Sequence, residues 1–377
     1  MGGVIASAGR FYSIAAEKSD LPSYFAATKS LVADATLALA GMALLLMFGM
    51  YWYGCTHWLT FTIAALVFAA SSGNSALLNS IQNAARLRAL VASHSCLDPW
   101  LKLVFAIGFM LWLGNTSTAV VSGYAVSSIL LSGSQWYFLG RAILPSRNPA
   151  LLATNVWRQP MRIYAWPFSV WGVFTWLQQA SDRWALQHFV GESGVGMYTV
   201  VFQLGFVPIG LITTMAITLI GPILYQRVGG TQDTIRNNSG HRLAWVMTGL
   251  SLAATGLAFF VALLLHKWLF KLFVAENYST ASYLLPWVIL AGGLFSAGQI
   301  LALKLMSEMR PESMTVVKVT TAIGGVGLNI WCASYFGIAG VVASLVIFSF
   351  VYCIWMAWLA RHSAVLDVLR VQSPHLD

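Results

Sequence analysis

The chain has 377 residues, of which 58% are hydrophobic and only 9% are charged. About one quarter of the residues of a soluble globular domain are charged, so this composition excludes an ordinary soluble enzyme or binding domain. The formal net charge of +9 raises the question of a nucleic-acid partner, which the distribution of the charges along the chain can answer.

Apolar runs near 20 residues, the length that crosses a hydrocarbon core of roughly 30 Å, recur along the whole chain. The runs are continuous, which favours helices over the alternating pattern of a β-barrel. We therefore predict an all-α polytopic membrane protein with about eleven transmembrane helices. Their approximate positions are 2–17, 31–54, 58–80, 100–114, 117–138, 163–182, 194–224, 243–265, 283–304, 315–334 and 337–360, the first being weak and the fourth short.

The basic residues fix the expected orientation. With alternating spans and a cytoplasmic C-terminus, 17 of the 21 Lys and Arg fall on the cytoplasmic side, three fall on the other side, and Arg10 lies inside a span. Cytoplasmic loops of membrane proteins carry such an excess of Lys and Arg. The net charge is therefore a topology signal, and we predict no nucleic-acid partner. Eleven spans would leave Met1 outside, so we expect that one helix precedes this chain; a natural eleven-span protein is the alternative.

A polar stretch in the middle of the chain predicts two lobes. Residues 140–162 contain four Arg and three Pro between two apolar runs, which is typical of a linker. The predicted division is an N-terminal lobe of about five helices (1–140), a cytoplasmic linker (141–162), a C-terminal lobe of six helices (163–360) and a cytoplasmic tail (361–377). A weak internal repeat supports this division. Tyr12, Asp20 and Lys29 in the first lobe have the same spacing as Tyr225, Asp233 and Arg242 in the second.

The sequence carries no motif that indicates catalysis or cofactor binding. The four cysteines have no CxxC spacing, and we expect them to be packing residues. The seven histidines have no metal-ligand spacing, and the sequence contains no P-loop. We therefore predict no metal, no cofactor, no catalytic residues and a protein that is not an enzyme.

Three stretches resemble the polysaccharide-export flippases of the multidrug/oligosaccharidyl-lipid/polysaccharide (MOP) superfamily, which include the O-antigen and exopolysaccharide flippases. The best is QQASDRWALQHFVGESGVGMYTVVFQLGFVPIGLITTMAITLIGPILY (178–225), with its SDR, its Gly-x-Tyr and its Pro-x-x-Tyr. RFYSIAAEKSDLPSYFAATKSL (10–31) is similar to the family's exit from helix two, and LNIWCASYFGIAGVVAS (328–344) to its link between the last two helices. Family members usually have twelve helices in two six-helix lobes, and the predicted spans of this chain depart from that pattern, since we expect that they do not include the first helix.

The resemblance implies a transporter of the bacterial cytoplasmic (inner) membrane, with a polar cavity between its lobes. Its substrate would be an undecaprenyl-pyrophosphate-linked oligosaccharide, moved from the inner to the outer leaflet for polysaccharide or lipopolysaccharide synthesis. Its other partners would be membrane lipids and, in the same synthesis, a polymerase and glycosyltransferases. A cation-coupled multidrug exporter of the same superfamily and a non-transporting partner of a polysaccharide-synthesis complex remain as alternatives.

Polar residues within the apolar runs are candidates for the substrate cavity, because a charge at mid-span costs about 2.5–3.5 kcal/mol. Arg10 lies in the first run, and its guanidinium could bind a pyrophosphate or sugar hydroxyls; snorkelling to the interface is the alternative. Gln178, Gln179, Asp182 and Arg183 form two i, i+4 pairs on adjoining faces of one helix. Arg183 could bind an anionic head group while Asp182 orients it or carries a coupling proton, unless the two form an interfacial ion pair.

Three further polar residues complete the candidate cavity set. Gln203 and Gln299 lie within spans, and interhelical hydrogen bonding is the favoured explanation for both. Lys304 follows an apolar run and points either inward or to the cytoplasmic interface. Asp34 lies near a span end, and we expect it at the interface.

Overall fold

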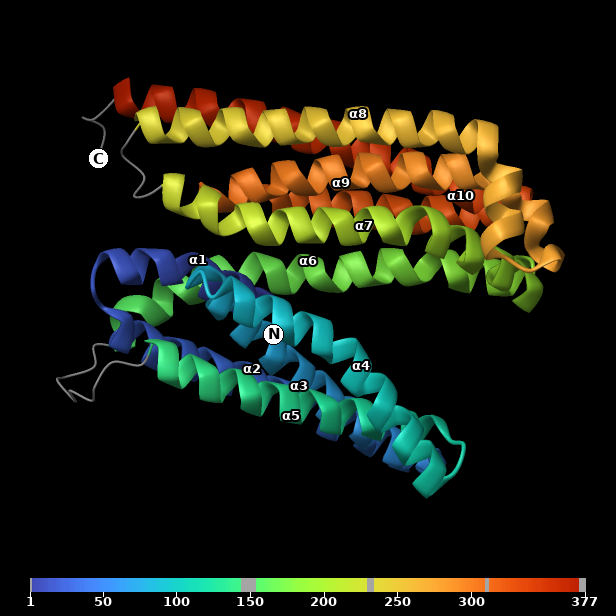
Figure 1. Cartoon of the computed structure of the whole chain (residues 1–377), viewed down its shortest axis with the longest axis horizontal. Helices are drawn as coiled ribbons and strands as arrows, with labels where there is room; N and C mark the ends of the chain where they lie inside the picture. The colour runs from blue at the N-terminus through green and yellow to red at the C-terminus, as the bar shows by residue number, and fades with distance from the viewer. Residues whose placement is uncertain (1, 144–153, 229–233, 309–311, 373–377) are drawn as a thin grey trace. The chain divides into compact units, whose positions relative to one another are not determined.

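The computed structural model describes residues 2–143, 154–228, 234–308 and 312–372, which are almost entirely helical (Figure 1). The α-helices are α1 (Gly2–Glu17), α2 (Leu21–Trp52), α3 (Leu59–Ala84), α4 (Arg88–Leu113), α5 (Ser117–Ile143), α6 (Thr154–Phe189), α7 (Glu192–Val228), α8 (Thr234–Phe273), α9 (Leu285–Ser307) and α10 (Ser313–Gln372). Two 3-10 helices, η1 (Thr56–Trp58) and η2 (Glu276–Leu284), precede α3 and α9.

Helix α10 consists of two helical arms. Gly337 has φ of 55° and ψ of −133°, a backbone conformation that does not continue an α-helix and that favours glycine. Counting the arms separately, the described residues form eleven long helical segments, as the apolar runs predict. The all-α polytopic fold class is thereby confirmed.

Seven helical stretches among the described residues are long and apolar enough to cross a membrane. One of them, Ser313–His362, has 50 residues and contains the bend at Gly337, so it is long enough for two crossings at about 20 residues each. The outward faces of the helices carry large apolar side chains; Leu111 and Leu264 are both 84% exposed. Such surfaces suit a hydrocarbon solvent, because a soluble monomer rarely exposes large apolar patches.

The chain divides into two compact units, an N-terminal unit (Met1–Ser169) and a C-terminal unit (Val170–Asp377). The division falls within α6, whereas the sequence places it in the polar linker 141–162. Residues 144–153 of that linker and residues 373–377 of the tail lie outside the described residues, as does Asp233 of the weak repeat.

Helices α3, α4 and α5 pack against one another in the N-terminal unit, where α1 contacts α2 and α3. In the C-terminal unit α9 is the central helix, since it packs against α7, α8 and α10 (Figure 1). Glycine permits one of these contacts: a Cβ at Gly293 of α9 would lie within 2.5 Å of three side-chain atoms of Thr255 on α8. Helices α7 and α10 are therefore both packed against α9 in this unit.

The fourth span begins twelve residues before its predicted start. Helix α4 has 26 residues, from Arg88 to Leu113, and it includes Pro99, which the apolar run at 100–114 leaves outside. Proline is tolerated inside transmembrane helices, although its missing N–H weakens one turn. Because the helix begins earlier, Asp98 lies inside it rather than in a loop, one turn before Lys102.

Candidate functional site

The Asp182 carboxylate is buried and hydrogen-bonded in the C-terminal unit. The hydroxyl of Tyr198 on α7 donates to its Oδ2 over 2.5 Å, and the backbone N–H of Arg183 donates to its Oδ1 over 2.7 Å. Asp182 is 6% exposed and Tyr198 is fully buried. A carboxylate that is removed from water costs much less when it accepts hydrogen bonds, so Tyr198 stabilises the burial of Asp182.

The loop between α6 and α7 makes this contact possible. Helix α6 ends at Phe189 and α7 begins at Glu192, so only two residues join them. Gly191 has φ of 92°, a left-handed conformation that a residue with a side chain rarely adopts. The sharp turn brings α7 back along α6, and Tyr198 thereby meets a residue 16 positions earlier in the chain.

A second set of buried hydrogen bonds connects α6 to both arms of α10. The Ser181 hydroxyl donates to the carbonyl of Gln178 over 2.7 Å and accepts from the Asn329 amide nitrogen over 2.8 Å. The Asn329 amide oxygen in turn accepts from the Ser344 hydroxyl over 2.6 Å. Ser181, Asn329 and Ser344 are all at most 4% exposed, so these bonds lie in the interior.

We call Gln178, Ser181, Asp182, Tyr198, Asn329 and Ser344 the polar cluster. It joins α6, α7 and the two arms of α10 within one unit, and it includes two of the predicted cavity residues, Gln178 and Asp182. The Gln178 side chain lies against Gly325 of α10, where a Cβ would be 3.1 Å from its Cγ. A carboxylate at such a junction can gain or lose a proton, and its hydrogen bond with Tyr198 would change with it.

The other predicted residues of this unit lie elsewhere. Gln179 and Arg183 are on the exposed face of α6, so the Arg183 guanidinium is accessible to a ligand. Gln203 on α7 is exposed and Gln299 on α9 is half-buried. Lys304, at the end of α9, is 1% exposed; its ammonium lies 3.5 Å from the Glu308 carboxylate and donates to the carbonyl of Ala360.

Arg10 lies in the N-terminal unit, whereas all residues of the polar cluster belong to the C-terminal unit. Its side chain is 1% exposed, on the helix face of α1 that also buries Ser7 and Phe11. Phe11 contacts the rings of Trp157 and Tyr164 on α6 edge-on, with centroids 6.3 and 5.7 Å away. Arg10 is therefore an interior residue of its unit, not one that reaches an exposed interface.

Two carboxylates of the N-terminal unit, Asp34 and Asp20, form polar contacts with residues of α6. Asp34 accepts from the Arg158 guanidinium over 2.9 and 3.3 Å, and both side chains of this pair are partly exposed. Asp20, between α1 and α2, accepts from the Trp157 indole over 2.7 Å. Hydrogen bonds from the Ser23 side chain and then from Trp157 lower the pKa of Asp20 below its usual 3.8.

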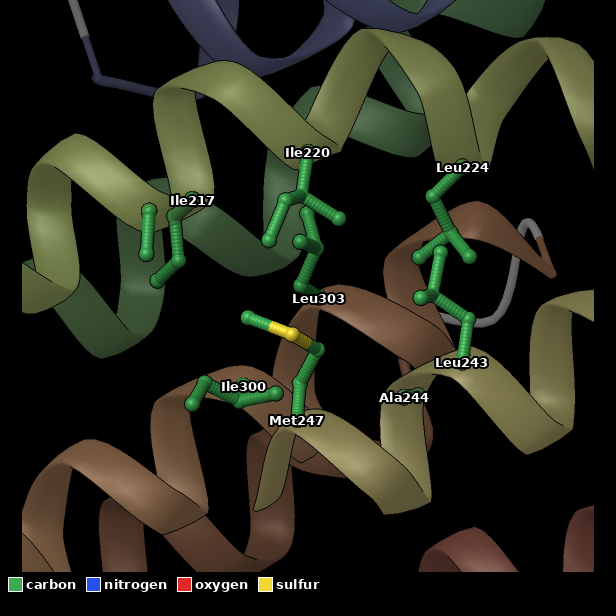
Figure 2. Close-up of a pocket in the computed structure, with 9 residues that line it drawn as sticks. Ile217, Ile220, Leu224, Leu243, Ala244, Met247, Ile300 and Leu303 are labelled. Carbon is green, nitrogen blue, oxygen red and sulfur yellow. The ribbon is translucent and has the colours of Figure 1, made fainter. Parts of the chain in front are cut away.

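An apolar gap in the C-terminal unit is too small for a substrate. Figure 2 shows that side chains of α7, α8 and α9, among them Ile220, Met247 and Leu303, surround it. Its volume of about 20 Å³ has room for about one water molecule, and its lining offers that water almost no polar surface. It is a packing gap between three helices.

The sequence prediction missed Ser181, Tyr198, Asn329 and Ser344. A signal was present for Tyr198, because it is the tyrosine of the Gly-x-Tyr in the stretch 178–225. Asn329 and Ser344 likewise lie at the two ends of the stretch 328–344. Neutral polar residues in apolar runs are common, so composition alone does not distinguish these four from others.

No protein-family model matches the sequence, and no curated protein matches it either. Solved structures do match the fold. An outward-facing multidrug resistance MATE family transporter of the MOP superfamily superimposes with a TM-score of 0.67 at 16% identity, over 97% of this chain and 83% of that one. The Vibrio cholerae MATE transporter VcmN in its bent form gives 0.72 at 14% identity, over 97% and 84%. Over almost its whole length, then, the chain has the fold of the MATE transporters.

Proposed function

We propose that this chain is a membrane transporter of the MOP superfamily and that it moves its substrate without a covalent step. The observation that carries the proposal is the fold, which is shared over 97% of the chain with a transporter of that superfamily. The superfamily is also the one whose flippases the three sequence stretches resemble. We further propose that the protein lies in the bacterial inner membrane, as the resemblance implies, with a cytoplasmic C-terminus, which the distribution of its Lys and Arg supports.

For the substrate we propose a lipid-linked oligosaccharide with an anionic pyrophosphate, moved to the outer leaflet. Cations outnumber carboxylates among the predicted cavity residues: Arg10, Arg183 and Lys304 against Asp182. Arg183 is the best placed of them to bind an incoming anion, because it is exposed while Arg10 and Lys304 are buried. Outward movement of an anion is favourable in a cell that is negative inside, by roughly 2.3 kcal/mol per charge per 100 mV.

The polar cluster has a supporting role in this proposal. The Asp182 carboxylate accepts hydrogen bonds from the Tyr198 hydroxyl and from the backbone N–H of Arg183, the exposed cation that follows it in α6. Gain of a proton by Asp182 would change its contact with α7 and, through the same turn of α6, the position of Arg183. Asp182 is thus the residue through which proton movement would couple to binding of the anion.

The test is the leaflet accessibility of the undecaprenyl-linked glycan in a strain that lacks the gene. Restoring the gene should restore outward accessibility, and Arg183→Ala should impair that rescue while protein levels stay normal. Arg183→Lys, which keeps the charge, and Gln187→Ala, one turn further along the exposed face of α6, are the matched controls. Arg10→Ala should impair rescue too. Full rescue by both Arg→Ala variants would overturn the role of cations in substrate binding.

A cation-coupled multidrug exporter is the second candidate. The matching solved structures include a multidrug resistance transporter, and Asp182 is a buried carboxylate of the kind that exchanges a proton for a cationic drug. Ethidium efflux from cells distinguishes the two: an exporter should extrude ethidium, and Asp182→Asn should abolish the extrusion. A chain that neither extrudes ethidium nor alters glycan accessibility would be a non-transporting partner of a synthesis complex.

A further inference from the structure

A polar pocket lies within the N-terminal unit, among α3, α4 and α5, and its lining residues include none of the predicted cavity residues. Its volume is about 320 Å³, at the lower end of the roughly 300–1,000 Å³ of pockets that bind small molecules. Each helix turns one polar face toward it, since the polar residues recur at helical spacing. They include Ser75 and Asn79 on α3, His94, Asp98 and Lys102 on α4, and Ser128 and Gln135 on α5.

The charged pair of this pocket lies deep in the span. Asp98 is ten residues after Arg88, the first residue of α4, and therefore about 15 Å along the helix. Lys102 binds it over 2.7 Å, and the side chains of Lys102 and Asp98 remain 26% and 31% exposed. Charges at this depth are costly against lipid and normally face a bundle interior or a water-filled cavity. The pair therefore indicates that the pocket contains water or a polar ligand.

Several polar groups of the wall are held in fixed directions. The Ser75 hydroxyl donates to the Gln135 side-chain oxygen over 3.0 Å, which joins α3 to α5. His94 Nδ1 lies 2.8 Å from the carbonyl of Leu90, so the proton of the neutral ring is on Nδ1. Its Nε2 then accepts from Ser134 on α5 over 3.1 Å. A wall ordered in this way is prepared to bind a ligand with little loss of side-chain freedom.

Ser128 provides the independent sign of a ligand. It is 1% exposed and lines the pocket, and among the described residues none hydrogen-bonds to its hydroxyl oxygen. A buried hydroxyl without a partner is costly, and such groups usually mark a bound water or ligand. Ser127, its neighbour, is equally buried and also without a partner, but it does not line the pocket.

We propose that this pocket binds a neutral sugar residue, which in the proposed function belongs to the oligosaccharide being moved. The Asp98–Lys102 pair has no net charge, so the pocket favours neither an anionic phosphate nor a cationic drug. Its other polar groups are hydroxyls, amides and an imidazole, which both donate and accept hydrogen bonds. Sugar hydroxyls do the same, and the unpartnered Ser128 hydroxyl would gain a partner from one of them.

The test is ligand-observed NMR on the full chain in lipid nanodiscs, with glucose, galactose, N-acetylglucosamine and rhamnose as probes. At least one of these sugars should bind, and Ser128→Ala should weaken its binding by about three- to tenfold, the value of one hydrogen bond. Ser127→Ala is the matched control and should leave binding unchanged. The double variant Asp98→Asn, Lys102→Met, which keeps the pocket neutral, should weaken binding more than Ser128→Ala does.

Failure of this inference can be told apart from failure of the proposed function. If no sugar of the panel binds, if Ser128→Ala binds as the wild type does, or if ethidium binds in a way that depends on Ser128, the sugar pocket is wrong. If glycan accessibility depends on the gene in all these cases, the flippase proposal stands without the pocket. If instead the sugar binds as described but the glycan moves without the gene, the pocket stands and the transport proposal falls.

Discussion

The hydrogen bond between Tyr198 and Asp182 yields the sharpest prediction for the C-terminal unit. Tyr198→Phe removes one oxygen atom and leaves the ring, which stacks obliquely with Phe202 at 5.7 Å, in place. The change therefore tests the hydroxyl and not the packing. Because Asp182 is 6% exposed, water cannot easily take the place of the lost donor.

The expected cost follows from the kind of hydrogen bond. A bond to a charged group contributes about 1.5–3 kcal/mol, so Tyr198→Phe should lower the free energy of unfolding by about that amount. For a cooperative unit of 150–250 residues, each kcal/mol shifts the unfolding temperature by roughly 2–4 °C. We therefore expect a decrease of about 3–12 °C, measured by thermal unfolding of the purified protein in detergent micelles.

Tyr352→Phe is the matched control. Tyr352 is also a buried tyrosine of the C-terminal unit, 2% exposed, but its hydroxyl has no hydrogen-bond partner among the described residues. Removal of that hydroxyl should leave stability unchanged or raise it slightly. Equal destabilisation by the two variants would refute the reasoning, since it would show that the contact with Asp182 contributes nothing specific. In an Asp182→Asn background, Tyr198→Phe should cost less than in the wild type.

Two further predictions concern the N-terminal unit. A Cβ at Gly123 would lie 2.6 Å from the backbone oxygen of Phe105 on α4, so Gly123→Ala should lower the free energy of unfolding by about 1–3 kcal/mol. Gly133→Ala is the control: a Cβ at Gly133 would have no atom within 4 Å, so this change should leave the free energy of unfolding unchanged or raise it by about 0.5–1 kcal/mol. The pKa of Asp20 is lower in the folded protein than its value of 3.8 in the unfolded chain. Asp20 therefore contributes to the stability of the fold above pH 3.8, and this contribution is lost as the pH falls through the folded pKa. Trp157→Phe removes one hydrogen-bond donor to Asp20, so this variant should lose less stability than the wild type on acidification below about pH 4. Solvent screening keeps the difference small, and an equal loss in the two proteins would contradict the prediction.

Most of the fold could be predicted from apolar runs, because a helix that crosses a membrane needs little more than length and hydrophobicity. The prediction was wrong where polar residues enter a span: at α4 the apolar run begins after Pro99, but the helix begins at Arg88. His94, Asp98 and Lys102 recur at four-residue spacing and turn to one face, toward α3 and α5. Their periodicity was visible in the sequence, but the neighbouring helices that make this face an interior one were not.

The candidate site was predictable only in part, for a similar reason. Asp182 and Gln178 are identifiable as polar residues in an apolar run, whereas their partners come from helices whose rotation no local pattern specifies. Arg10 and Lys304 are buried within their units, and the sequence could not distinguish burial from snorkelling. Arg183 and Gln179, one residue along from buried neighbours, are exposed because 100° of helical rotation per residue separates adjoining side chains.

Two of the three stretches that resemble flippases take on a physical meaning in the C-terminal unit. All six residues of the polar cluster lie in two of them, 178–225 and 328–344, and each stretch also contains the left-handed glycine, Gly191 or Gly337, that folds its two helical segments back on each other. A hydrogen bond then joins one stretch to the other, donated by the Asn329 amide to the Ser181 hydroxyl across 148 positions of sequence. A resemblance spread over separate parts of the chain thus describes one structural unit: two sharp turns and the buried hydrogen bonds that they align. Loss of either turn should therefore disrupt the cluster as a whole, because Asp182 and Asn329 are held by partners on the far side of a glycine.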